Sequence, residues 1–329
     1  QLIREEVTQL DQIEGVHPAF AEFDLLIPIY HKDNLMAVVF LENLSELNQE
    51  QDGMIDTTKF VQMLSNVIIV AIENKKLVRK QLSQEALRKE LEIARSVQSR
   101  LFPKQLPNLP HLQVEATYLP NDMVGGDYYD FIPLDADKFI CCIADVSGKG
   151  VPASLLMANF QASLRVLARQ TQDLGKILEE LNFLIYDHVQ GENFITFFVM
   201  LFDLEKKTVK YVNAGHNPAF WVNEDQNLQP LENGTTILGA FEALPFLKVT
   251  ELNYDQSFTV FSYTDGVTEL RNDAGEEYGT TRLQDFFARQ PYAYQLKAIH
   301  EDLIKSLNMY RQKQLFCDDV TLFSVRICL

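Results

Sequence analysis

Four short acidic motifs in the last two-thirds of the chain carry the residues that could do chemistry. They read Val-Gly-Gly-Asp-Tyr-Tyr-Asp (124–130), Ala-Asp-Val-Ser-Gly-Lys-Gly (144–150), Tyr-Thr-Asp-Gly-Val-Thr-Glu (263–269) and Cys-Asp-Asp-Val-Thr (317–321). Each places a carboxylate beside a strand-like apolar run or a glycine turn, where the backbone can approach an ion closely. Converging carboxylates repel one another unless divalent cations neutralise them. Oxygen ligands with few histidines favour Mg²⁺ or Mn²⁺, so the pattern predicts a metal-dependent hydrolase.

Asp145 is the strongest candidate ligand. It follows the apolar run 139–143 and precedes a Ser-Gly-Lys-Gly turn that leads into a helix. A carboxylate there can bridge two metal ions, and the carbonyl of Val146 offers a further oxygen. The alternative is an aspartate that only caps the turn or the helix. The glycines around Lys149 do not form a nucleotide phosphate loop, because the first glycine of that motif and the Ser or Thr after the lysine are both missing.

The other motifs supply further candidate ligands. Asp127 follows two glycines and heads a predicted strand in which Asp130 lies on the opposite face, so we expect Asp127 to be a ligand and Asp130 to be structural. Asp265 repeats the order of strand, aspartate and glycine. Asp318 and Asp319 precede the last apolar run, and only one of them can point into a site.

His216 lies in a turn between two predicted strands, at 213–218. It could act as a general acid or contact a phosphate, and a turn histidine held by backbone hydrogen bonds is at least as good an interpretation. The sequence shows no Ser/His/Asp or Cys/His nucleophile set, which favours a metal-activated water.

Composition narrows the class of protein. The 329 residues suffice for two domains, and 47% hydrophobic with 23% charged residues is ordinary for a globular protein. A formal charge of −17 argues against nucleic-acid binding. The four cysteines form no Cys-x-x-Cys pair, so we expect free thiols in a reducing cytoplasm. We expect no membrane span in this sequence; it begins at Gln1 rather than Met, so we expect it to be a fragment.

The sequence pattern predicts that the chain has three parts. Residues 1–75 read as an α/β segment with strands at 23–29 and 35–41 and a helix at 60–72. Residues 76–104 read as a linker, because 73–98 lacks Gly and Pro and forms one long helix that three prolines then end. Residues 105–329 alternate strands and helices, which predicts stacked sheets flanked by helices in the α+β class.

The linker helix has an imperfect heptad seam. Its apolar members are Leu77, Leu87, Leu91, Ala94 and Leu101, and its interruptions are Lys80, Gln84 and Gln98. Such a seam predicts a weak, adjustable dimeric coiled coil, and hence a homodimer. A solvated helix packed on its own domain is the alternative.

At the acidic motifs the sequence resembles the PPM/PP2C-type serine/threonine phosphatases, specifically the bacterial branch of stress-response and sporulation phosphatases (RsbU and SpoIIE). The matching segments are 91–94, 97–98, 101–103, 125–130, 145–150, 214–218, 265–266 and 318–321. Residues 22–75 resemble the second half of a GAF sensory domain, through 27–29 and 67–74.

The resemblance implies an αββα sandwich with two Mn²⁺ or Mg²⁺ ions at its edge. It implies Asp145 as the bridging ligand, Val146 as a carbonyl ligand, and Asp265 and Asp318 as further ligands, while Asp127 maps to the first acidic motif. Asp127 and Asp145 are then the expected catalytic residues. Eukaryotic relatives place an arginine shortly before the first motif, but 119–123 has none, so the metals are expected to carry more of the substrate charge.

The leading hypothesis is therefore hydrolysis of phosphoserine or phosphothreonine on a protein, with a STAS-type anti-sigma-factor antagonist as the expected substrate. Regulation is expected through the N-terminal part and the linker. The alternatives are a catalytically inactive dimeric scaffold and a two-metal nuclease. The acidic set argues against the scaffold, which has no reason to concentrate unpaired carboxylates, and the acidic net charge argues against the nuclease.

Overall fold

The computed structural model describes residues 8–10, 17–20, 22–31, 34–42, 51–291 and 294–329. The chain divides into two compact units, Gln1–Lys89 and Glu90–Leu329. The boundaries predicted near residues 75 and 104 stay predictions, as does the GAF-like character of the first part.

The first unit contains a three-stranded sheet and most of a long helix. Strands β1 (Thr8–Gln9), β2 (Leu25–His31) and β3 (Asn34–Leu41) lie in that order, and a short 3-10 helix (Pro18–Phe20) precedes β2. Residues 32–33, between β2 and β3, lie outside the described part. Val61 and Ile69 of the helix pack against the buried side chains of β2.

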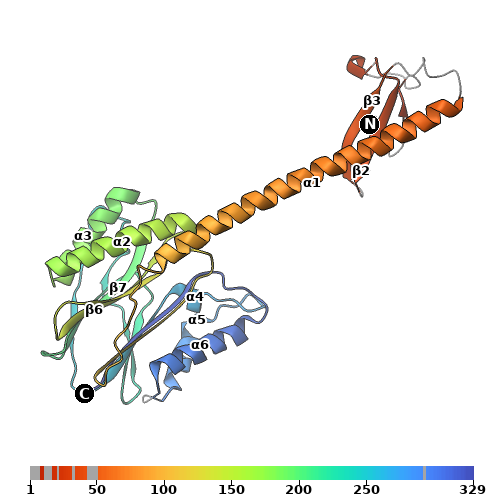
Figure 1. The fold of residues 1–329 in the computed structure, drawn as a ribbon. Coiled ribbons are helices and arrows are strands. Elements are labelled where there is room, and N and C mark those ends of the chain that lie inside the picture. Colours follow the sequence, from red (N-terminus) through yellow and green to blue (C-terminus); the bar gives the residue numbers. More distant parts are fainter. Residues whose placement is uncertain (1–7, 11–16, 21, 32–33, 43–50, 292–293) are drawn as a thin grey trace. The chain divides into compact units, whose positions relative to one another are not determined.

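Helix α1 (Gln51–Gln98) is one unbroken helix of 48 residues (Figure 1). The sequence predicted a helix at 60–72 and another at 73–98. They merge because nothing between them interrupts the backbone hydrogen bonds. Within the residues that the structure describes, none of the helices combines the length and the hydrophobicity that a bilayer crossing requires.

The second unit is built on two sheets. The first has the order β10-β9-β13-β14-β4, and the second has β11-β8-β7-β6-β5 with β12 beside β8. Their strands are β4 (Leu112–Leu119), β5 (Tyr128–Pro133), β6 (Lys138–Val146), β7 (Ile195–Asp203), β8 (Thr208–Ala214), β9 (Ala219–Asn223), β10 (Leu228–Leu231), β11 (Gly234–Thr235), β12 (Thr250–Asn253), β13 (Phe258–Tyr263) and β14 (Val320–Ile327). The helices are α2 (Gly150–Gln170), α3 (Leu174–Val189), α4 (Asp265–Thr268), α5 (Gly279–Ala288) and α6 (Leu296–Arg311).

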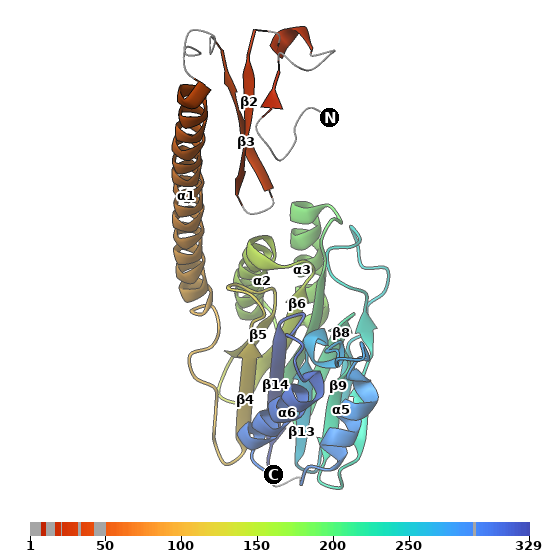
Figure 2. The same cartoon turned by 90° about the vertical axis from the view of Figure 1, so that its right-hand side faces the viewer.

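The layers follow from strands that are apolar on both faces. In β6, Phe139 and Ile143 pack into the core between the two sheets, whereas Ile140 and Ala144 pack under α2 and α3. Helices α5 and α6 cover the outer face of the other sheet (Figure 2). Val267 of the short helix α4 packs into the same core. This αββα arrangement confirms the predicted fold class. Strands β10 to β12 and helix α4 were not predicted, because they are too short to show a period.

Candidate metal centre

The four acidic motifs meet at one end of the sandwich. Strand β5 begins directly after Asp127, and its partner β6 ends directly after Asp145. In the other sheet, β13 ends two residues before Asp265, and its partner β14 begins two residues after Asp318. Rigid strand ends therefore hold all four carboxylates near one another, although the motifs are far apart in sequence.

Asp127 is almost fully buried, with 2% of its surface exposed. Its Oδ2 accepts hydrogen bonds from the hydroxyls of Thr264, at 2.8 Å, and Thr321. Thr264 directly follows β13, and Thr321 lies in β14. Burial raises its pKa well above the ordinary value, and the charge of Asp145 adds to the rise, while the two threonines oppose it. The threonines thus fix the orientation of a carboxylate that has little access to water.

Most of the charges that act on Asp145 and Asp265 belong to other acids. Burial, together with the charges of Asp265 and Asp318, raises the pKa of Asp145 to about 7. Burial raises the pKa of Asp265 to about 6, with contributions from Glu269 and Asp318. A divalent cation would relieve this mutual repulsion, so the donor set fits Mg²⁺ or Mn²⁺.

Asp318 and Asp319 have different surroundings. The buried Asp319 accepts the backbone N–H groups of Asn121, at 2.8 Å, and Gly126, at 3.0 Å. Asp318 is half-buried, and its Oδ2 lies 2.8 Å from Nζ of Lys149. Asp319 therefore ties the loop before β14 to the first acidic motif, whereas Asp318 has a carboxylate that can turn toward a cation. This difference supports the prediction that Asp318 is the ligand.

Two glycines allow the loops to meet at this point. A Cβ on Gly126 would lie 2.8 Å from the carbonyl oxygen of Val146, and a Cβ on Gly266 would lie 2.0 Å from that of Asp319. Neither position has room for a Cβ atom, so both require glycine. Gly126 therefore leaves room beside the carbonyl oxygen of Val146, the predicted backbone ligand.

A small hollow of about 30 Å³ lies in the centre. Asp145, Asp318, Asp319 and Lys149 are part of its lining. Asp127 and Asp265 lie outside the lining. The charge of Asp145 acts on Asp127, and the charge of Asp265 acts on Asp145. Among the described residues, no three His, Cys, Asp or Glu side chains already form a ready-made metal-binding group. The ligand roles therefore stay predictions.

The role of Gln98 was not predicted from the sequence. Its buried side-chain amide donates to the carbonyl of Gly125, at 2.7 Å, and accepts the N–H of the same residue, at 3.3 Å. Leu101 packs against the core under α2. The prediction that these two positions belong to a partner-facing seam is therefore wrong, since they face their own domain. Heptad spacing could not show this, because it does not distinguish a partner helix from the domain that follows.

Asp130 has the structural role predicted for it. Nε and Nη2 of Arg165, on α2, donate to its two oxygens at 2.7 and 2.8 Å, and the hydroxyl of Tyr128 donates to it as well. The pair joins strand β5 to helix α2, which covers it.

His216 is buried in the turn after β8. Its Nδ1 lies 2.8 Å from the hydroxyl of Thr196, and its backbone N–H donates to Oδ1 of Asn213 at 2.8 Å. Burial lowers the pKa of His216 to about 4, so the ring is neutral near pH 7. These contacts favour the interpretation that His216 holds the turn.

Residues 135–327 match the family model described as stage II sporulation protein E (SpoIIE). The chain belongs to this family. Protein IcfG of Synechocystis is 26% identical over 311 residues, which are 86% of this chain and 47% of IcfG. Phosphoserine phosphatase RsbU of Bacillus subtilis is 29% identical over 246 residues, 74% of this chain and 71% of RsbU. The chain thus spans about half the length of one of these relatives.

Solved structures share the fold of this SpoIIE-family chain. The SiaA-PP2C domain of Pseudomonas aeruginosa has a TM-score of 0.64 at 21% identity, covering 74% of this chain and 98% of that domain. The RsbU and RsbW domains of Rv1364c from Mycobacterium tuberculosis give a TM-score of 0.58 at 23% identity, covering 68% of this chain and 63% of that one. The second unit therefore has a PP2C-type phosphatase fold.

Proposed function

We propose that this chain is a metal-dependent phosphatase that hydrolyses phosphoserine or phosphothreonine on a regulatory protein. The observation that carries the proposal is the meeting of Asp127, Asp145, Asp265 and Asp318 at one end of a PP2C-type sandwich, where burial and mutual repulsion raise the pKa of three of them. The relatives RsbU and RsbP are phosphoserine phosphatases, which supports the same reaction.

The residues of this chain would divide the work as follows. Asp145 and the carbonyl of Val146 offer oxygens from one sheet, and Asp265 and Asp318 offer oxygens from the other. Asp127 is held in place by two threonine hydroxyls. Two Mn²⁺ or Mg²⁺ ions, when bound, would acidify a water and neutralise the phosphoryl oxygens.

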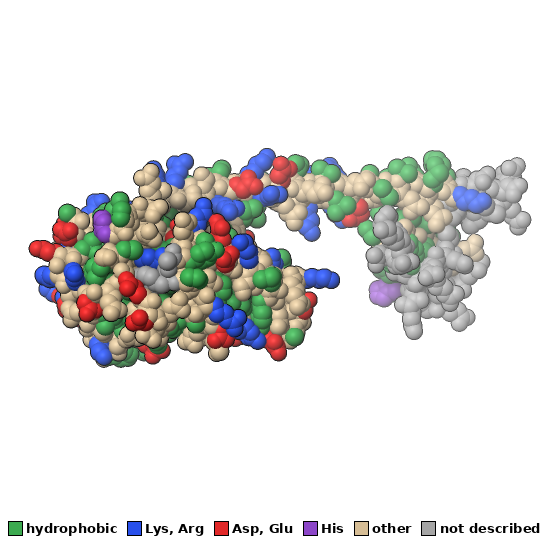
Figure 3. Space-filling model, turned by 90° about the horizontal axis from the view of Figure 1, so that it is seen from below, with side chains coloured by type: hydrophobic (Ala, Val, Ile, Leu, Met, Phe, Trp, Pro, Cys, Tyr) green, Lys and Arg blue, Asp and Glu red, His purple; other side chains and the backbone are tan. Residues whose placement is uncertain are grey.

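The finer proposals concern the substrate and the regulation. We propose a STAS-type anti-sigma-factor antagonist as the substrate, a cytoplasmic location, and control through the N-terminal unit. A homodimer through α1 is supported by exposed apolar side chains on this helix, such as Leu77 and Leu87, each 57% exposed. On the face shown in Figure 3, acidic and basic side chains are interspersed, which fits a protein partner better than a nucleic acid.

The test is turnover of p-nitrophenyl phosphate and of a phosphoserine protein, with Mn²⁺ and with a chelator in its place. The proposal predicts phosphate release that depends on the metal for both substrates. A folded, dimeric chain without turnover at any Mn²⁺ concentration would instead support the inactive scaffold.

A further inference from the structure

The candidate metal centre contains an ammonium group that a set of acidic ligands does not require. Nζ of Lys149 lies 2.8 Å from Oδ2 of Asp318 and donates to the carbonyl of Cys317 at 2.6 Å. The side chain is 57% exposed. Among the described residues that line the hollow with Asp145, Lys149 is the single cation.

The position of Lys149 in the fold is unusual for a lysine. It is the N-cap residue of the 21-residue helix α2, and its side chain makes no capping hydrogen bond. N-cap positions favour Ser, Thr, Asp or Asn, whose oxygens accept the first N–H groups of the helix. The positive end of the helix dipole repels a cation and attracts an anion. The lysine and the helix end therefore present positive charge together at the mouth of an acidic centre.

We propose that Lys149 is a substrate-binding residue whose ammonium group receives a phosphoryl oxygen of the phosphorylated side chain. This inference rests on the proposed phosphatase function and adds a group that recognises the substrate. A phosphorylated serine or threonine carries a charge of about −1.5 to −2 near pH 7. The segment 119–123, before the first acidic motif, contains no Arg or Lys that could meet this charge.

Charge balance explains why the lysine becomes available. Two divalent cations would bring four positive charges, which match the carboxylates of the four predicted ligands, Asp127, Asp145, Asp265 and Asp318. The remaining carboxylate of the lining, Asp319, keeps its two backbone N–H donors. Asp318 then no longer needs Lys149 as its counter-ion. The side chain is exposed and flexible, so its ammonium can leave Asp318 for the phosphoryl group. Lys149 and a metal ion therefore compete for Asp318, and once the metal is bound Lys149 is available to the substrate.

The test compares Lys149→Met and Lys149→Arg with the unchanged protein. Calorimetry measures binding of inorganic phosphate to the Mn²⁺-loaded proteins and, separately, binding of Mn²⁺ to the metal-free proteins. We expect Lys149→Met to weaken phosphate binding about tenfold or more, and Lys149→Arg to keep most of it. We expect Mn²⁺ affinity in Lys149→Met to stay equal or to rise, because Asp318 loses its competitor. In steady-state assays KM for the phosphoprotein should rise.

Two results would overturn the inference. Phosphate binding by Lys149→Met as tight as in the unchanged protein would show that the lysine does not contact the anion. A loss of Mn²⁺ binding in Lys149→Met would show that the lysine only shapes the loop around Asp318. The proposed phosphatase function fails separately, if the unchanged protein has no Mn²⁺-dependent turnover at all.

Discussion

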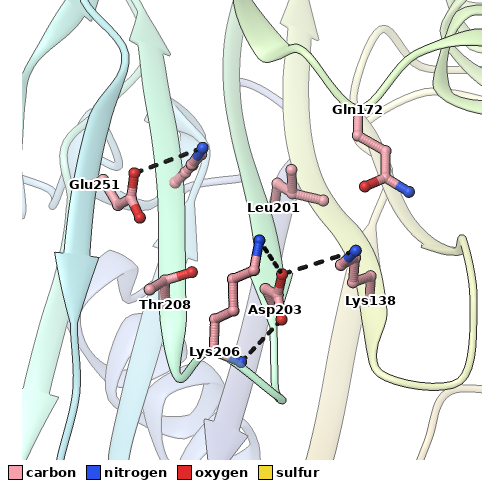
Figure 4. A pocket seen from close by; sticks show the side chains of 8 residues that line it. Lys138, Gln172, Leu201, Asp203, Lys206, Thr208 and Glu251 are labelled. Atoms are coloured by element: carbon pink, nitrogen blue, oxygen red, sulfur yellow. Dashed lines mark hydrogen bonds and ion pairs between the residues drawn. The ribbon is translucent and has the colours of Figure 1, made fainter.

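The carboxylates at the two ends of strand β6 have opposite kinds of charged neighbours. At the start of the strand, Oδ2 of Asp203 lies 3.8 Å from Nζ of both Lys138 and Lys206 (Figure 4). Lys210 pairs with Glu251 at 3.5 Å beside them. These residues line a hollow of about 140 Å³ in which both acids of the lining have a lysine partner.

At the other end of β6, Asp145 faces Asp265 and Asp318, and burial and these charges raise its pKa to about 7. Lys149 is the cation that the lining of this end provides. Acids with a lysine partner stabilise the fold, whereas buried acids that face other acids indicate a site for a cation that the chain itself does not supply. We therefore expect one strand to carry both a structural end and a functional end.

The largest effect is expected where an unpaired acid is neutralised. Asp145→Asn should abolish Mn²⁺-dependent turnover, because it removes charge from the predicted shared ligand of both cations. It should leave the thermal unfolding temperature unchanged or higher, since it relieves repulsion. Residual turnover above about a tenth of the original, equivalent to a barrier change of only about 1.4 kcal/mol, would show that Asp145 is not the central ligand.

The matched control lies at the other end of the same strand. Asp203→Asn removes partly exposed ion pairs, which contribute about 0.2–1 kcal/mol to stability. We expect a slightly lower unfolding temperature and unchanged turnover. Equal losses of turnover in both variants would abolish the distinction between the two ends of β6.

A paired acid can be turned into an unpaired one. Arg165→Met leaves Asp130 buried without its cation, which should destabilise the fold by roughly 3 kcal/mol in denaturant unfolding. Arg165→Lys keeps the charge but loses the two-point contact, so it should cost less. If Arg165→Met unfolds at the same denaturant concentration as the unchanged protein, pairing at Asp130 contributes nothing to stability.

A smaller effect is expected from the contact between α1 and the centre. Gln98→Leu removes both hydrogen bonds to Gly125, two residues before Asp127, so turnover should fall severalfold while the protein stays folded. Gln84→Leu is the matched control, since Gln84 is exposed on the same helix. It should leave turnover unchanged in the monomer and change only self-association, measured by analytical ultracentrifugation. Equal effects of the two variants on turnover would contradict a specific role for Gln98.

The sequence predicted the sandwich because its strands are long apolar runs and its helices have clear apolar faces, as in β6 and α3. It located the acidic motifs because each sits at the end of such a run. It did not reveal Thr264 and Thr321 as partners of Asp127, because those contacts join positions 137 and 194 residues apart. These contacts form only when the two sheets pack together, so a local sequence pattern cannot predict them. The same holds for Gln98, whose partner is fixed by how the helix meets the domain.

Calorimetric titration of Mn²⁺ into the metal-free chain and its Asp145→Asn and Asp203→Asn variants tests the two-cation centre most directly. The predicted result is binding of two ions to the unchanged protein and to Asp203→Asn, with binding to Asp145→Asn lost or strongly weakened. Mn²⁺ binding to Asp145→Asn with the original stoichiometry and affinity would contradict the assignment of the functional end of β6.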